Sequence, residues 1–234
     1  MFAIFKKEIR NYFLTPIGYI FISPFILLSA MFFIQGVVYY QTARVDYILS
    51  PVNIICLFIV PILTMQLFAE ERNKKTDQLL ITAPVNVYEI VVGKYLAAFA
   101  VFFAALAFTF IYTIILFVIG KPVLSEVIGS YLGFILIWAV FISVGIFISS
   151  LTESQVVAAI LTFMVLLVLY SIDSWTASIT QPVVKTVIGW LSVFKRYSNF
   201  QIGLLSLPDV LYYLSFVFVM LFLTARNIEK RRYN

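Results

Sequence analysis

The side chains that usually carry catalysis or bind metals are scarce in this sequence. It contains no histidine, so the commonest general base and the commonest metal ligand are both missing. Its single cysteine, Cys56, lies inside an apolar run, which leaves neither a disulfide framework nor a thiolate metal site. The sequence therefore predicts a chain that is not an enzyme and that binds no cofactor or metal of its own.

Two glycine-lysine pairs resemble the end of a phosphate-binding loop, which requires a glycine five residues before its last glycine. That position is Tyr88 for the pair Gly93-Lys94 and Ile115 for the pair Gly120-Lys121. The chain is therefore not expected to bind ATP through such a loop.

The densest group of charged side chains lies between two apolar runs and begins Glu70-Glu71-Arg72. Glu70 with Lys74, and Glu71 with Lys75, are spaced i, i+4 with the acid first, which is the order that stabilises a helix. A solvated connector helix explains this spacing. An apolar patch in the next turn instead suits docking into a groove of another protein, and its members are Leu79, Leu80 and Ala83.

The elements that must position these residues are set by an unusually apolar composition. Hydrophobic residues make up 63% of the chain and charged residues only 12%, whereas soluble domains have about half and about a quarter. The net charge of +5 does not indicate nucleic-acid binding, because the basic residues lie beside apolar runs and form no soluble basic module. The composition predicts a multi-pass membrane protein.

Six apolar runs are long enough to cross a bilayer, which needs about 20 residues for a helix. Thr15-Pro16 and Ser50-Pro51 are typical N-caps followed by a first-turn proline, and they predict the starts of the first two spans. Asn86 with Glu89, and Thr152 with Gln155, have the spacing of capping boxes. The expected spans cover about residues 17–40, 51–69, 95–119, 127–149, 155–172 and 208–225.

Two further segments are expected to lie at the membrane surface. Apolar side chains at three- and four-residue intervals predict an amphipathic interfacial helix over the first 13 residues, with Lys6, Lys7 and Arg10 on its polar side. Residues 173–207 mix Trp175 and Trp190 with basic residues, which indicates interfacial or re-entrant helices. Asp173 is interpreted as an interfacial or capping residue.

The distribution of basic residues predicts the orientation of the spans. Eleven of the 16 lysines and arginines lie in the N-terminal segment, the connection after span two and the C-terminal tail, which share one side. Because basic residues favour the cytoplasmic side, both termini are expected to lie in the cytoplasm. The membrane is expected to be the plasma membrane or, in a cell with two membranes, the inner one.

An ordered set of short motifs resembles the type 2 ABC exporter permeases, and in particular the subgroup associated with gliding motility. The resemblance spans essentially the whole chain. Its motifs are Lys7-Glu8 before Thr15-Pro16, Glu70-Glu71-Arg72, Leu79-Leu80, Thr82-Ala83-Pro84-Val85, Glu89 to Lys94, Gly145 to Ser150 with Leu151 to Gln155, and Phe222-Leu223-Thr224 with Glu229 to Arg232.

This resemblance implies that residues 1–234 form a single transmembrane permease domain. Two six-span subunits, identical or different, would enclose a substrate path in the bilayer, and a separate cytoplasmic ATPase subunit would hold ATP and magnesium. A coupling helix after span two would contact the ATPase, and a second cytoplasmic segment would make a smaller contact. The implied contacts are Glu70, Glu71, Arg72, Lys74, Lys75, Gln78, Leu79 and Thr82 in the first segment, and Thr152, Glu153 and Gln155 in the second.

One departure from the family pattern affects the coupling helix. Where the family commonly has Gly-Thr after the charged turn, this chain has Lys75-Thr76, so the bend expected there is in doubt. Two other functions stay open at this point. One is an ATP-independent channel or carrier, which the shortage of charge within the spans disfavours, and the other is a membrane anchor for a partner ATPase complex.

Overall fold

Six helices in the structure are long and apolar enough to cross a membrane, as the sequence predicted. The structure is a computed structural model that describes residues 1–234 except 40–43, 77–85, 179–180, 182–188, 191 and 233–234. Within the described part the chain is helical and contains no strand. The six long helices are α2 (Pro16–Ile34), α3 (Asp46–Thr64), α6 (Val87–Ile119), α7 (Leu124–Leu151), α8 (Gln155–Ser178) and α11 (Leu207–Arg232).

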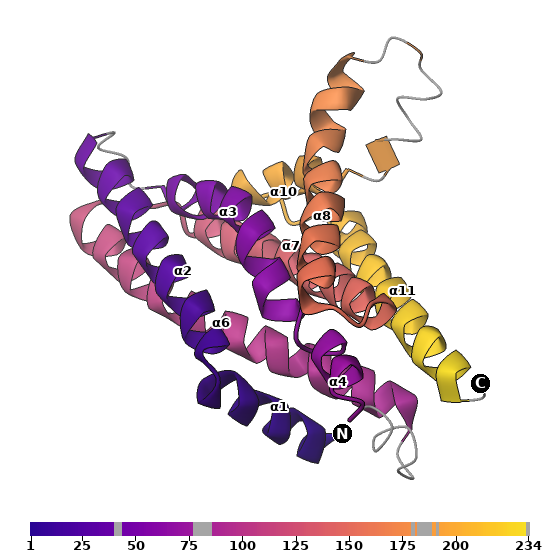
Figure 1. Ribbon diagram of the computed structural model, residues 1–234. Helices are drawn as coiled ribbons and strands as arrows, with labels where there is room; N and C mark the ends of the chain where they lie inside the picture. Colours follow the sequence, from indigo (N-terminus) through magenta and orange to yellow (C-terminus); the bar gives the residue numbers. More distant parts are fainter. Residues whose placement is uncertain (40–43, 77–85, 179–180, 182–188, 191, 233–234) are drawn as a thin grey trace.

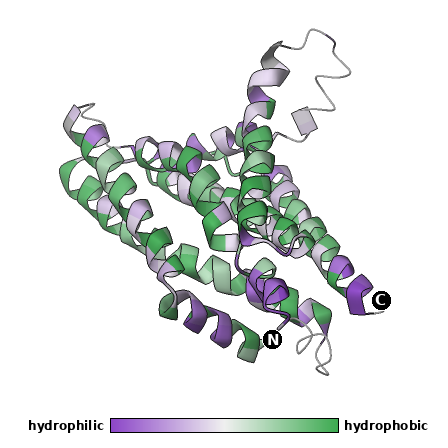
Figure 2. Cartoon of the chain, viewed as in Figure 1, coloured by the Kyte–Doolittle hydropathy of each residue, from purple (hydrophilic) through white to green (hydrophobic). Residues whose placement is uncertain are grey.

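Shorter helices lie at the two ends of the bundle. The N-terminal helix α1 (Phe2–Leu14) and the five-residue helix α4 (Ala69–Asn73) lie at the end where both chain termini are found, which we call the termini end (Figure 1). Helix α10 (Phe194–Gln201) lies at the opposite, distal end, and α2 continues into a π-helical turn (Gln35–Tyr39). Figure 2 shows hydrophilic residues gathered in α1, in α4 and at the C-terminal end of α11, while the long helices are mainly hydrophobic.

Two of the four predicted N-caps are correct, and α8 also begins at the expected residue, Gln155. Thr15 and Asn86 are the N-caps of α2 and α6, and the Asn86 side chain accepts a hydrogen bond from the Tyr88 N–H. The Ser50-Pro51 start is wrong, because α3 begins a turn earlier at Asp46, whose carboxylate favours a helix N-terminus and accepts two hydrogen bonds from Arg44.

The two predicted capping boxes form only in part. Glu89 does not close back on Asn86 but binds the amino group of Met1 at 2.7 Å. At the start of α8 the Val157 N–H bonds to the Ser154 hydroxyl, while Thr152 donates to the Ser154 carbonyl. Ser154 therefore takes the position that the sequence assigned to Thr152.

Helix α7 is the most deeply buried of the six long helices. Trp138 of this helix is fully buried, stacks on Phe102 of α6 at a ring distance of 4.6 Å and meets Phe25 of α2 edge to face at 5.6 Å. Aromatic pairs in these geometries add to the free energy gained from close packing. Because Trp138 contacts both α2 and α6, it holds these two helices against α7.

Helix α10 packs against α7 through two glycines spaced four residues apart. A Cβ atom at Gly129 would collide with the main-chain carbonyl of Phe200, and one at Gly133 would lie 2.7 Å from the Cβ of Phe200. Small residues at this spacing let helices approach closely inside a membrane protein. The predicted helix between the last two long helices is therefore present, and whether it enters the bilayer stays a prediction.

Replacement of Gly133 by alanine is expected to destabilise the fold. The added methyl group must displace Phe200 or Tyr197, and overpacking of this kind costs about 1–3 kcal/mol. Thermal unfolding of the purified chain in detergent measures the change, and Gly189→Ala is the control because no atom lies within 4 Å of the added methyl position. Equal melting temperatures for the two variants would contradict the close packing of α10.

Candidate functional site

The candidate site is built on the segment that leaves α3 and forms α4 at the termini end. Ser149 of α7 holds this turn, because its hydroxyl accepts hydrogen bonds from the Phe68 and Ala69 N–H groups, both at 3.2 Å. The same hydroxyl donates to the Met65 carbonyl at 3.1 Å. The first N–H groups of a helix have no partner within the helix, so a side chain of α7 supplies the cap that α4 lacks.

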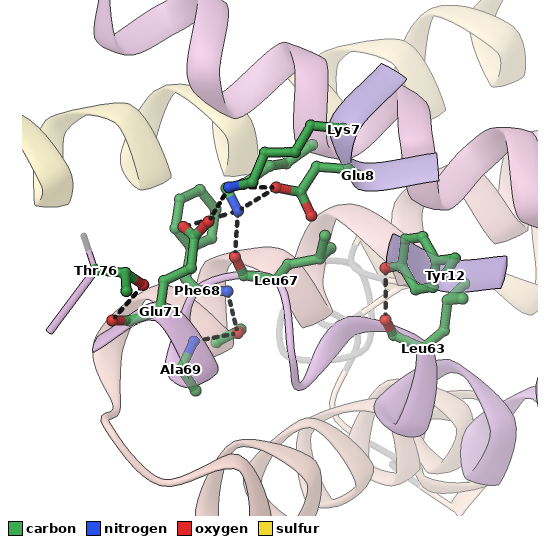
Figure 3. A network of polar contacts seen from close by, with 11 residues as sticks. Lys7, Glu8, Tyr12, Leu63, Leu67, Phe68, Ala69, Glu71 and Thr76 are labelled. Atoms are coloured by element: carbon green, nitrogen blue, oxygen red, sulfur yellow. Dashed lines mark hydrogen bonds and ion pairs between the residues drawn. The ribbon is translucent and has the colours of Figure 1, made fainter. Parts of the chain in front are cut away.

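A buried lysine joins α4 to two other helices, and Figure 3 shows its partners Glu8, Leu67 and Glu71. The side chain of Lys94, from α6, is only 1% exposed, and its ammonium group has three oxygen atoms around it. These are Glu8 Oε1 of α1 at 3.1 Å, Glu71 Oε2 of α4 at 2.9 Å and the Leu67 carbonyl at 2.6 Å. The ammonium also lies 5.0 Å from the ring centre of Phe68.

Lys7 of α1 completes this group by binding Glu71 Oε1 at 3.0 Å and lying 3.6 Å from Glu8. Although partial burial acts to lower the pKa of Lys7, the carboxylates of Glu71 and Glu8 raise it above its ordinary value. We call Lys7, Glu8, Glu71 and Lys94 the Lys94 cluster. Its two positive and two negative charges balance, which is the condition under which charges are tolerated away from water.

Helix α1 is held at a second point by Tyr12. This side chain is fully buried and donates a hydrogen bond to the Leu63 carbonyl near the end of α3 at 2.7 Å. Figure 3 shows Tyr12 on the same side of α1 as Glu8, facing the turn between α3 and α4. The expected amphipathic helix is therefore present, and a carboxylate and a hydroxyl on its inner face fix it to the bundle.

The turn between α7 and α8 is tied to α4 and to α11. Arg72 of α4 binds Glu153 at 2.7 Å. The Asn227 amide of α11 donates to the Ser150 carbonyl at 2.9 Å, and Arg231 donates to the same carbonyl. Polar contacts therefore join α4, the end of α7 and α11 at the termini end.

A sharp bend follows α4. Lys75 has a positive φ of 55°, a left-handed conformation that non-glycine residues rarely adopt, and the Thr76 N–H bonds back to the Glu71 carbonyl at 2.9 Å. The family bend that Lys75-Thr76 put in doubt is thus present, with lysine in a conformation that glycine adopts more easily.

The predicted contact residues of α4 divide into an inner and an outer group. Glu70 pairs with Lys74 at 2.6 Å as the spacing predicted, but the Glu71–Lys75 pair is wrong, because Glu71 points inward to Lys94 and Lys7. Lys74, Lys75 and Thr76 are exposed. Gln78, Leu79 and Thr82 lie outside the described residues, and so does the apolar patch of Leu79, Leu80 and Ala83.

In the second predicted contact segment the three residues also differ in exposure. The Glu153 side chain is 68% exposed although it binds Arg72, whereas Thr152 and Gln155 are partly buried. Glu153 is therefore the residue of this segment that lies next to α4 and also faces outward.

A cavity of about 550 Å³ opens between α1 and α4, and charged side chains of both signs line it. Among the described residues, no group of three histidine, cysteine, aspartate or glutamate side chains could hold a metal ion. The charges pair with each other at fixed distances, an arrangement suited to transmitting force between segments. The lining residues are Lys7, Glu8, Asn11, Thr15, Gln66, Leu67, Glu70, Glu71, Lys74, Thr76 and Lys94.

Sequence reasoning missed the central role of Lys94 and Glu8. Lys94 enters the interpretation of the sequence in a glycine-lysine pair, in the motif Glu89 to Lys94 and among the basic residues, but not as a charged residue within an apolar run, which is itself a signal for a functional or structural site in a membrane protein. Glu8 carried no such signal, because it lies among the charged residues of α1.

The sequence profile of one protein family covers nearly the whole chain. The family described as "ABC-2 family transporter protein" matches residues 2–225. No curated protein matches the chain.

Removal of the Lys94 charge is expected to destabilise the protein strongly. Lys94→Met leaves Glu8 and Glu71 facing each other in a buried site, and loss of one partner from a buried ion pair costs about 3–5 kcal/mol. The free energy of unfolding in mixed micelles measures this loss. Lys121→Met, at an exposed position, is the control and should change stability by less than about 0.5 kcal/mol.

A double variant tests whether the effect of Lys94→Met comes from the charge. Addition of Glu8→Gln to Lys94→Met should recover part of the lost stability, since it removes one of the two facing carboxylates. If the two substitutions were simply additive, the Lys94 cluster would not act as one unit.

Proposed function

The chain belongs to the ABC-2 family of transporter proteins, and on this premise we propose that it is the permease subunit of an ATP-driven exporter. Membership in this family, together with six apolar helices, makes it a multi-pass membrane protein of an ABC transporter. Within the family we assign it to the gliding-motility-like subgroup, on the ordered motifs that run from Lys7-Glu8 to the basic C-terminal turn.

In this proposal a cytoplasmic ATPase subunit binds ATP and magnesium and docks on the termini end of the permease. The docking surface, which we call the coupling surface, consists of α4, the following turn Lys74–Thr76 and the turn between α7 and α8. The exposed side chains Lys74, Lys75 and Glu153 offer charges of both signs to the partner.

The observation that carries the proposal is the attachment of α4 to four long helices. Ser149 joins α4 to α7, and the Lys94 cluster joins α4 to α6. The ion pair of Arg72 with Glu153 joins α4 to the start of α8. Helix α4 also follows α3 directly in the chain. A displacement of α4 by the ATPase would therefore move the ends of four long helices together. Such a connection is what a permease without its own ATP site requires.

A second permease subunit, identical or different, completes the transporter in this proposal. The long helices α2, α8 and α11 keep most of their apolar surface outside the bundle, which supplies faces for lipid and for a second subunit. The substrate path would lie between the two subunits.

Both termini are proposed to lie in the cytoplasm, and cysteine labelling tests this orientation. The only native cysteine, Cys56, is buried, so background labelling should be low. Lys121→Cys, at the distal end, is expected to react with a membrane-impermeant maleimide in intact cells, whereas Lys75→Cys should react only after permeabilisation. The reverse pattern would place the coupling surface outside the cell and exclude a cytoplasmic ATPase.

Reversal of two charges on the coupling surface is expected to weaken binding of the ATPase. The double variant Lys74→Glu, Lys75→Glu replaces two exposed cations, and loss of charge complementarity should lower the recovery of a copurifying ATP-binding chain by about tenfold. Quantitative mass spectrometry of the complex purified from native membranes measures this recovery.

A matched variant separates the site from general charge effects. Lys230→Glu, Arg232→Glu reverses two exposed charges at the same end of the molecule but on α11, so it should leave recovery of the ATPase nearly unchanged. Equal losses for both double variants would contradict docking on the coupling surface.

A further inference from the structure

A second cavity lies at the distal end, remote from the coupling surface. Its volume is about 310 Å³, which is at the lower end of the range for small-molecule sites. It lies between the start of α3, the end of α8 and helix α10. The residues that line it are Ser50, Asn53, Ile54, Tyr170, Asp173, Ser174, Phe194, Tyr197 and Gln201.

Asn53 presents an unused hydrogen-bond donor in this cavity. The Trp138 indole donates to Asn53 Oδ1 at 3.2 Å, and because an indole N–H can only donate, this bond fixes which amide atom is oxygen. The Nδ2 group is buried and has no hydrogen-bond partner within the described part of the chain. Asn53 as a whole is 1% exposed, so an unmet donor here carries a substantial free-energy cost.

Tyr197 of α10 presents a second unused group in the same cavity. It is 3% exposed, and its hydroxyl makes no well-aligned hydrogen bond with the residues that the structure describes, although the side chains of Gln201, Ser50 and Asn53 lie close to it. Burial, the largest effect, raises the pKa of Tyr197 above its ordinary value, while nearby Gln201, Ser50 and Asn53 act to lower it. The hydroxyl therefore stays protonated and is available as both donor and acceptor.

The other polar groups of the cavity are mostly engaged. Gln201 donates to the Ser50 hydroxyl, which joins α10 to α3, and Asp173 accepts a hydrogen bond from Ser192. Among the described residues that line the cavity, Asp173 is the only charged one. Two aromatic rings, Tyr170 and Phe194, meet edge to face at 5.0 Å and give the cavity an apolar wall.

These groups select the chemical class of a ligand by its charge. An anion would be repelled by Asp173, and none of the described lining residues is basic and could offset that repulsion. A cation would suit Asp173 but would leave the Asn53 Nδ2 group without an acceptor. A neutral hydroxylated ligand meets both needs, because each hydroxyl donates and accepts, and its C–H groups can lie against the aromatic wall.

We propose that the distal cavity binds a neutral polyhydroxylated group, such as the sugar of a glycolipid or a free sugar, through Asn53, Tyr197 and Asp173. The proposal stands on the cavity alone and does not depend on the proposed function. Octyl β-glucoside and methyl β-glucoside are suitable probes, because they present the same sugar with and without an alkyl chain.

The experiment measures the stabilisation of the full chain against thermal unfolding as each probe is titrated into protein held in phosphatidylcholine nanodiscs. Tyr197→Phe removes one hydroxyl and should raise the concentration for half-maximal stabilisation about fivefold, the effect of one net hydrogen bond. Tyr212→Phe is the matched control, because Tyr212 also has a buried hydroxyl without a partner in the described residues but does not line the cavity.

The two probes distinguish the source of the sugar. Stabilisation by both glucosides supports a free sugar as the ligand, and stabilisation by octyl β-glucoside alone supports the head group of a membrane glycolipid. In both cases Tyr197→Phe should weaken the stabilisation and Tyr212→Phe should not. Stabilisation by neither probe, equal responses of the two tyrosine variants, or stronger stabilisation by octyltrimethylammonium would overturn the proposal.

Discussion

The termini end of this protein depends on keeping one buried ammonium group charged. Lys94 lies in α6, whose only other charged residue is Glu89, and a lone buried charge there would be far less stable than in water. Two carboxylates are therefore needed close by, and they come from two other segments, α1 and α4. The position of α1 and the inward direction of Glu71 both follow from this requirement.

Away from that cluster, the arrangement of the helices depends on α7. Its buried faces meet α2 and α6 through Trp138, α10 through Gly129 and Gly133, and the turn before α4 through Ser149. A single helix thus contacts the coupling surface and also two residues that line the distal cavity, Asn53 through Trp138 and Tyr197 through Gly133. Because the contacts are tight at both ends, a movement of α7 at one end must be accommodated at the other.

The sequence was sufficient to predict the parts of the fold that depend on composition and local pattern. Six spans, the amphipathic α1 and the starts at Pro16 and Val87 follow from apolar run length and capping residues. The start of α3 was missed because Ser50-Pro51 matches a helix start, whereas Pro51 lies inside α3, where a proline is normally unfavourable. The partners of Lys94 were missed because Glu8 and Glu71 are 86 and 23 residues away from it, and no short-range pattern reports such contacts.

The contacts that hold α4 differ in how much salt can reach them. The side chains of Arg72 and Glu153 are 17% and 68% exposed, so dissolved ions weaken the attraction between them. The hydroxyl of Ser149 is uncharged and the Lys94 ammonium group is buried, so salt has much less effect on these two contacts. A rise in ionic strength would therefore loosen α4 from the α7–α8 turn and leave its attachment to α6 and α7 in place. The inner contacts of α4 are therefore resistant to salt, while its outer contact responds to the surrounding solution.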